Sequence, residues 1–221
     1  MDRVLKNVKN LLESDQSGHG IDHVERVLEL SLRFCENENA NKEVVTLIAL
    51  LHDVDDYKLF GKENAESLHN ANKILELCNV DESIKKHVLD EIKRIGYSKA
   101  LKGIRPCTIE GKIVSDADMC DASGAHGLLR CYAYSMKINQ PFFNAQLFPI
   151  EDMTQEKYTT CDSTSVNHMF EKLLKLKDLM LTPSGKEETI KRHEIIVSFL
   201  RHYFEEENAI EWLEMLEKVS L

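Results

Sequence analysis

The residues best suited to chemistry end a run of apolar residues in the segment LIALLHDVDDYKLFG, residues 47–61. The apolar run stops at His52 and Asp53, and Asp55 and Asp56 follow almost at once. Burying an ionised carboxylate is costly in free energy unless something pairs with it. A metal ion is one such partner, so we consider this segment a candidate metal site.

Two other segments carry further candidate ligands. His23, in GHGIDHVERV, lies on the apolar face of a predicted helix, where a lone histidine is more often a core residue than a ligand. Asp116, Asp118 and Asp121 belong to a half-buried helical pattern in GKIVSDADMCDASGAHG. Successive helical residues point about 100° apart, so only one of Asp116 and Asp118 is expected to reach a given ion. Histidines and carboxylates without a cysteine set suit Mn²⁺, Fe²⁺, Ni²⁺, Mg²⁺ or Zn²⁺ and do not select among them.

The elements that must position these residues are predicted to be helices. The apolar period is helical almost everywhere, and no run of alternating residues indicates a strand, which predicts an all-α fold. Residues 139–162 form the longest irregular segment, which is typical of a lid or binding loop, and TPSG is predicted to be a turn. The predicted helices cover about residues 4–12, 21–35, 44–51, 64–78, 81–96, 109–120 and 124–135, then 163–180 with Ser163 or Thr164 as cap, and one or two helices over 186–219.

Composition limits the class of protein. A chain of 221 residues with 43% hydrophobic content predicts a single globular domain. A formal charge of −10 argues against stable nucleic-acid binding, which needs a basic surface. We expect no membrane association, because no stretch approaches 18 uninterrupted apolar residues. The six cysteines contain no CxxC pair, and the N-terminal segment lacks the apolar core of a signal peptide, so we expect a cytoplasmic protein.

Four segments carry a resemblance to a known family. In order, GHGIDHVERVLELS, EVVTLIALLHDVDDYK, EGKIVSDADMCDASGAHGLLR and STSVNHMFEKLLKLKDLMLTPSGKEETIKRH resemble the HD-domain metal-dependent phosphohydrolase superfamily. They are most similar to the small bacterial-type HD hydrolases that include nucleoside triphosphate pyrophosphohydrolases. The resemblance implies a single helical HD domain over residues 1–221, with a motif-bearing core at about 18–135 and C-terminal helices at 163–219 packed on it.

The resemblance also implies the residues of the site. It assigns one divalent metal ion to His23, His52, Asp53 and Asp118, with Asp116 as the fallback for the last ligand. Asp56 matches an acidic residue that orients or deprotonates water in related hydrolases. The alternative interpretation of Asp56 is a solvated carboxylate at a helix end.

Substrate binding should need cations and polar side chains. The resemblance suggests that Lys58 and Arg130 contact phosphate oxygens, and Arg26 lies within a turn of His23. A second set of candidates lies in the segment SVNHMFEKL, where His168 is at least as well explained by a structural role. That set consists of Asn167, His168 and Lys172.

Three functions stay open at this level. The late STSVNH segment resembles enzymes that cleave (deoxy)nucleoside triphosphates to a monophosphate and pyrophosphate. A phosphomonoesterase or phosphodiesterase could use the same metal site, and so could a weakly catalytic, nucleotide-binding regulatory protein. Each implies a small phosphorylated substrate or ligand, and a homo-oligomer is left open. Acyl transfer is disfavoured, because the chain has no GxSxG nucleophile motif.

Overall fold

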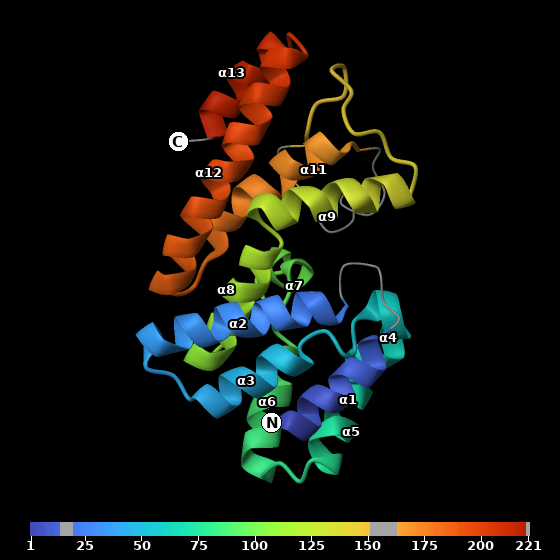
Figure 1. Cartoon of the computed structure of the whole chain (residues 1–221), viewed down its shortest axis with the longest axis vertical. Coiled ribbons are helices and arrows are strands. Elements are labelled where there is room, and N and C mark those ends of the chain that lie inside the picture. The colour runs from blue at the N-terminus through green and yellow to red at the C-terminus, as the bar shows by residue number, and fades with distance from the viewer. Residues whose placement is uncertain (14–19, 151–162, 220–221) are drawn as a thin grey trace. The chain divides into compact units, whose positions relative to one another are not determined.

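The computed structural model describes residues 1–13, 20–150 and 163–219, and every regular element in them is a helix (Figure 1). The predicted all-α fold is therefore confirmed. The chain divides into two units, residues 1–118 and 119–221, and the boundary falls inside helix α8. None of the helices in the described ranges has both the length and the apolar character needed to cross a bilayer.

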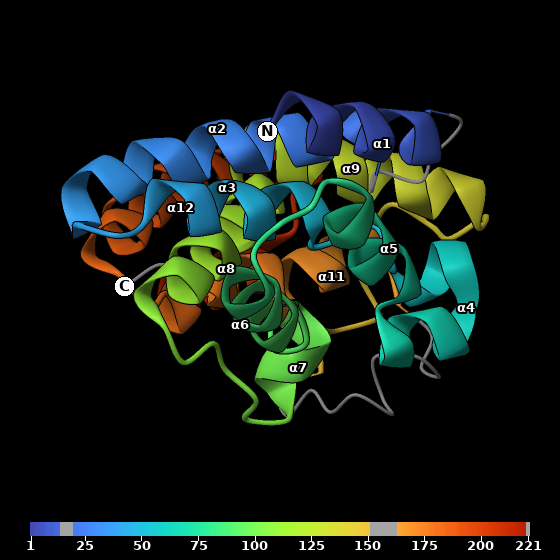
Figure 2. The ribbon, with the colours of Figure 1, turned by 90° about the horizontal axis from the view of Figure 1, so that it is seen from below.

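Helix α3 is the centre of the first unit. It packs against α1, α2 and α6 (Figures 1 and 2). Its apolar residues, among them Ile48 and Leu51, are buried. Asn41 begins α3 by accepting hydrogen bonds from the N–H groups of Glu43 and Val44. The helices of this unit are α1 (Asp2–Leu12), α2 (Ile21–Glu38), α3 (Lys42–Leu51), α4 (Tyr57–Ser67), α5 (His69–Leu77), α6 (Glu82–Ile92), α7 (Tyr97–Leu101) and the greater part of α8 (Ile109–Asp121).

The largest departure from the predicted helices lies between residues 57 and 78. The single helix predicted over 64–78 is wrong, because the chain forms α4 and α5 and breaks at Leu68. Leu68 has a left-handed backbone with φ of 52°, which is unfavourable for a residue with a Cβ. The apolar period runs through this break and does not reveal it. The helix predicted to reach Gly96 instead ends at Ile92, and α7 follows in a predicted loop.

Glu91 joins α6 to the start of α8 through a buried carboxylate. Its side chain accepts hydrogen bonds from the backbone N–H groups of Cys107 at 3.1 Å and Thr108 at 3.2 Å. Gly111, in the first turn of α8, leaves the space for this carboxylate. A Cβ at position 111 would overlap Glu91 Oε2 and come within 2.7 Å of its Cδ. Glycine is therefore needed at 111 while Glu91 keeps its place.

We expect Gly111→Ala to lower the free energy of unfolding by about 1 to 3 kcal/mol, measured by urea denaturation. Alanine favours a helix by about 1 kcal/mol over glycine, but displacing Glu91 breaks hydrogen bonds that are each worth about 1.5 to 3 kcal/mol. In a Glu91→Ala background the obstacle is gone, so the same substitution should be neutral or stabilising. Equal losses in both backgrounds would contradict this explanation.

The second unit is built around a core of large apolar and aromatic side chains, with Phe204 and Trp212 at most 1% exposed. Its helices are α9 (Gly124–Lys137), α11 (Ser165–Glu171), the 3₁₀ helix η1 (Leu173–Leu179), α12 (Pro183–Glu206) and α13 (Ile210–Val219).

Thr164 caps α11, so the second of the two predicted caps, Ser163 or Thr164, is the one observed. The predicted turn TPSG is wrong: Thr182 is the N-cap of α12, and Pro183 occupies its first turn, where a missing N–H is harmless. Residues 151–162 of the predicted irregular segment lie outside the described residues.

Cys131, on α9, is a buried thiol that should resist modification. Burial raises the pKa of the Cys131 thiol to about 12, and the nearby charge of Lys172 offsets only part of the rise. The thiolate is the reactive form, so iodoacetamide at pH 8 should leave Cys131 unmodified in the native protein and should modify it in urea. The exposed Cys107 serves as the positive control in the same peptide mass spectra. Equal native labelling of both cysteines would be the contrary result.

Candidate metal centre

Four of the predicted ligands come together in the first unit, from three different elements. His23 lies in the first turn of α2, where the apolar face of that helix turns inward and leaves it 2% exposed. His52 follows the last residue of α3, and Asp53 is next in the chain. Asp118 comes from α8. His23, His52 and Asp118 form a group whose nearest donor atoms all lie within 4.8 Å of one another.

The donor atoms of these four residues lie close to one another. The Nε2 atoms of His23 and His52 are 3.2 Å apart, and His23 Nε2 lies 3.4 Å from Asp53 Oδ2 and 3.5 Å from Asp118 Oδ1. His52 Nε2 lies 3.6 Å from Asp53 Oδ2. Ligands about 2.1 Å from an ion, at angles of 90° to 109°, are roughly 3.0 to 3.4 Å from one another. Two nitrogens and the Asp118 carboxylate therefore form a group that suits a divalent cation, and Asp53 Oδ2 lies close to both rings.

The ring of His52 is oriented by a backbone carbonyl. Its Nδ1 lies 2.8 Å from the carbonyl oxygen of Ala49, and only an N–H there can make this hydrogen bond. The bond therefore assigns the proton of a neutral ring to Nδ1 and leaves the lone pair of Nε2 for the cluster. Metal-binding histidines usually have such a partner on the second nitrogen.

The electrostatics of the cluster keep Asp118 ionised. Burial acts to raise the pKa of the Asp118 carboxyl, but the hydrogen bond with His23 and the attraction of the His52 and His23 rings when they are protonated outweigh it. The pKa of Asp118 consequently lies below its usual value, even though Asp53 opposes this. An anionic Asp118 is the form that can bind a cation.

Asp116 and Asp118, both in α8, differ in position, as the helical spacing predicts. Asp118 belongs to the group of close donor atoms, whereas Asp116 does not join it within the described residues. Asp116 is fully buried, at 0% exposed. The geometry thus favours Asp118 over the fallback Asp116.

Asp56, Lys58 and Arg26 belong to the same unit as the cluster. Asp56 is half-buried, and its carbonyl accepts the N–H groups of Leu59 and Phe60, so it occupies the N-cap position of α4. A helix cap is therefore a competing role for this residue. Lys58 lies in α4, but its side chain is outside the described part of the chain. Arg26 is half-buried one turn beyond His23 on α2.

The remaining predicted substrate residues all lie in the second unit. Arg130 Nη1 is 3.3 Å from Asp121 Oδ2, so its guanidinium already has an acidic neighbour. Asn167 is 1% exposed, and its Oδ1 accepts a hydrogen bond from the hydroxyl of Thr164 at 2.9 Å. Both residues have structural contacts, and their binding of phosphate stays a prediction, as does that of His168 and Lys172, which are half-buried.

Asp55 has a partner that the sequence did not predict. Its carboxylate is 4% exposed and accepts the backbone N–H groups of Asn70 and Ala71 at the start of α5, each at 2.8 Å. Burial raises the pKa of the Asp55 carboxyl, and the two N–H groups offset part of the rise. The sequence singled out Asp55 as a buried charge, but it held no signal for a partner 15 residues further along.

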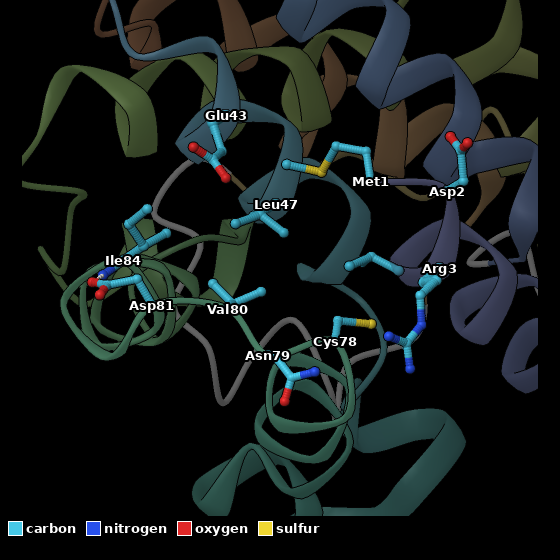
Figure 3. A pocket seen from close by; sticks show the side chains of 11 residues that line it. Met1, Asp2, Arg3, Glu43, Leu47, Cys78, Asn79, Val80, Asp81 and Ile84 are labelled. Atoms are coloured by element: carbon cyan, nitrogen blue, oxygen red, sulfur yellow. Dashed lines mark hydrogen bonds between the residues drawn. The ribbon is translucent and has the colours of Figure 1, made fainter.

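A surface hollow of about 390 Å³ in the first unit shares no residue with the cluster. Figure 3 shows Met1, Asp2 and Arg3 on one side of it, and Asp81 and Ile84 on the other. Arg3 donates a hydrogen bond to the carbonyl of Leu77 at 3.0 Å. The lining contains carboxylates but no histidine, so its chemistry differs from that of the cluster.

The fold and the cluster define a helical protein with a histidine and aspartate site suited to a divalent metal. Residues 20–123 match the family model of the HD domain. The sequence is 31% identical to YpgQ of Bacillus subtilis over 195 residues, which cover 88% of this chain and 87% of YpgQ. The structure of a Lactobacillus plantarum protein is similar, with a TM-score of 0.82, 31% identity and coverage of 94% of this chain and 96% of that one.

A crystal structure of an HD-superfamily hydrolase from Bacillus thuringiensis is also similar, with a TM-score of 0.73, 33% identity and coverage of 94% and 96% of the two chains. The chain therefore belongs to the HD-domain superfamily of hydrolases. YpgQ has been crystallised in complex with ADP, and that structure matches with a TM-score of 0.70, 25% identity and coverage of 91% of this chain and 97% of that one.

Proposed function

We propose that the protein is a metal-dependent phosphohydrolase that cleaves (deoxy)nucleoside triphosphates to a monophosphate and pyrophosphate. The observation that carries the proposal is the set of donor atoms of His23, His52, Asp53 and Asp118, spaced for one divalent ion. The complex of YpgQ with ADP supports a nucleotide as the ligand, because that relative accommodates a nucleoside diphosphate. The resemblance of the late segment STSVNHMFEKLLKLKDLM to the pyrophosphohydrolases favours this subgroup within the superfamily.

In the proposed mechanism, His23, His52, Asp53 and Asp118 hold the ion. When bound, a divalent ion lowers the pKa of a coordinated water and offsets negative charge on the phosphate. Asp56 accepts a proton from the attacking water while the water oxygen forms a bond to the α-phosphorus.

The bond from the α-phosphorus to the bridging oxygen then breaks, and pyrophosphate leaves. Arg26, Lys58 and Arg130 are the proposed cations for the phosphate oxygens, with Asn167, His168 and Lys172 as a second set. These side chains bind and orient the substrate, which is most of what phosphoryl hydrolysis requires of a protein.

A second candidate function is hydrolysis of a phosphomonoester or phosphodiester on the same site. The ADP complex of YpgQ is compatible with it, since ADP lacks the γ-phosphate that a triphosphatase substrate carries. A weakly catalytic protein that binds nucleotides for regulation would also bind ADP. The products distinguish the three: pyrophosphate for the first, orthophosphate or a new phosphomonoester for the second, and no product for the third.

The decisive experiment is a panel of metals against substrates. The purified protein is incubated with Mn²⁺, Mg²⁺, Fe²⁺, Ni²⁺ or Zn²⁺ and with nucleoside triphosphates, diphosphates, cyclic nucleotides or generic phosphoesters, and the products are separated by chromatography. His52→Ala, prepared in parallel, is the control for a contaminating phosphatase. Release of pyrophosphate by the wild type alone supports the proposal, whereas orthophosphate as the sole inorganic product would reassign the function.

Chelation and acid should both remove activity without unfolding the protein. Metal binding requires ligand atoms that carry no proton, so metal affinity should fall as the pH is lowered. A chelator should abolish turnover and leave the helical circular dichroism signal nearly unchanged, since large apolar cores hold both units. Loss of the helical signal on chelation would contradict this expectation.

A further inference from the structure

A set of three hydrogen bonds ties the chain just after Asp53 to the first turn of α5. Asp55 Oδ1 accepts the N–H of Asn70 and Asp55 Oδ2 accepts the N–H of Ala71, both at 2.8 Å. In return, the side-chain amide of Asn70 donates to the carbonyl of Val54 at 2.8 Å. We call these three bonds the Asp55–Asn70 clamp. It joins segments 15 or 16 residues apart in the sequence.

The clamp replaces a cap that α5 cannot form locally. The first N–H groups of a helix lack partners within the helix, and a side chain at the N-cap usually accepts from them. The N-cap of α5 is Leu68, whose apolar side chain makes no such bond. Asp55 provides the acceptor instead, and its negative charge suits the positive end of the helix dipole.

The clamp also holds the backbone on the C-terminal side of Asp53. On the N-terminal side, the N–H of Val54 donates a hydrogen bond to the carbonyl of Leu51, the last residue of α3, at 3.4 Å. Asp56 N–H bonds to the carbonyl of Asp53 at 3.1 Å, and Val54 is 0% exposed. Asp53 therefore lies between the end of α3 and an anchored Asp55, in a backbone held from both directions.

We infer that the Asp55–Asn70 clamp positions the metal centre: it fixes the backbone of Asp53 so that the Asp53 carboxylate meets His23 and His52. Asp55 is then a positioning residue and not a ligand. The inference rests on the proposed metal-dependent function. A ligand displaced by a fraction of an ångström binds less well, and outer partners of metal ligands typically contribute about 10-fold to 100-fold in affinity.

The test compares Mn²⁺ affinities by titration calorimetry, at a temperature well below thermal unfolding. Asp55→Asn keeps the shape of the side chain but turns an N–H₂ group toward a backbone N–H, so it should weaken Mn²⁺ binding by about 10-fold to 100-fold. The matched control is Asp81→Ala, which removes the cap of another helix in the same unit. Asp81 accepts from the N–H of Ser83 at 2.8 Å. Its loss should lower the melting temperature and leave Mn²⁺ affinity within about twofold of wild type.

A milder variant serves if Asp55→Asn does not fold. Asn70→Ala removes only the bond to the Val54 carbonyl and should weaken Mn²⁺ binding about fivefold, the equivalent of one hydrogen bond. Normal Mn²⁺ affinity in each folded clamp variant, beside a wild type that binds, overturns this inference alone. A wild type that binds no divalent metal, with no difference from His52→Ala, overturns the proposed function and this inference with it.

Discussion

Replacing Asp53 by asparagine should abolish metal binding and hydrolysis together. The carboxylate of Asp53 lies 3.4 Å from His23 Nε2 and 3.6 Å from His52 Nε2, so it is placed to share an ion with both rings. Asparagine has nearly the same shape but no charge, which removes much of its affinity for a divalent cation. A bound metal contributes several kcal/mol of transition-state stabilisation, so its loss should lower kcat/KM on the order of 10³-fold or more.

The measurement combines metal content by plasma mass spectrometry with turnover of the best substrate. Asp90→Asn makes the same chemical change at an exposed position of α6 and should leave both quantities at the wild-type level. Excess Mn²⁺ should restore part of the activity of Asp53→Asn, because the other three ligands remain. An Asp53→Asn variant with full metal content and full activity would contradict the assignment of Asp53.

The sequence located the cluster because its residues carry strong local signals. An apolar helix that ends in His52 and Asp53 is unusual, and the helical period of α8 separates Asp116 from Asp118 by simple geometry. The structure brings Asp118, and not Asp116, into the group of close donor atoms. Choosing Asp118 from the sequence nevertheless needed the resemblance to a family.

Two buried carboxylate contacts of the first unit were not predictable, because their partners are distant in the sequence. Asp55 bonds to the start of α5, and Glu91 bonds to residues 16 and 17 positions later at the start of α8. Local propensity describes neighbours within a helical turn or two, and it gives no information on such pairs. The same limit explains the missed break at Leu68, since leucine has no preference for a left-handed backbone and the apolar period continues across it.

The predicted end of α6 and the predicted start of α12 were also wrong. Gly96 is a plausible C-cap, but α6 stops at Ile92. The TPSG sequence has the composition of a turn, yet Thr182 accepts from the N–H of Gly185 at 3.0 Å and starts a long helix. In both places the sequence correctly indicated a helix boundary. Gly96 precedes α7 and does not end α6, and Thr182 precedes α12 and does not begin a turn.

Asp56→Asn should separate catalysis from metal binding, and the structure makes the substitution a clean one. Asp56 occupies the N-cap position of α4, where asparagine caps as well as aspartate. The variant should therefore keep its stability and its metal. If the carboxylate orients or deprotonates the attacking water, kcat should fall by roughly 10²-fold to 10⁴-fold, the usual scale of general acid–base assistance.

Asp56→Ala provides the contrast, because alanine is a poor residue at an N-cap position and also lacks the charge. It should lower the free energy of unfolding by about 0.5 to 2 kcal/mol and lower kcat to the same extent as Asp56→Asn. Equal losses of kcat in two variants of unequal stability would separate the chemical role from the structural one. If Asp56→Asn instead turns over substrate at the wild-type rate while Asp56→Ala is only less stable, then Asp56 is a helix cap, and the water must be activated by the metal centre without it.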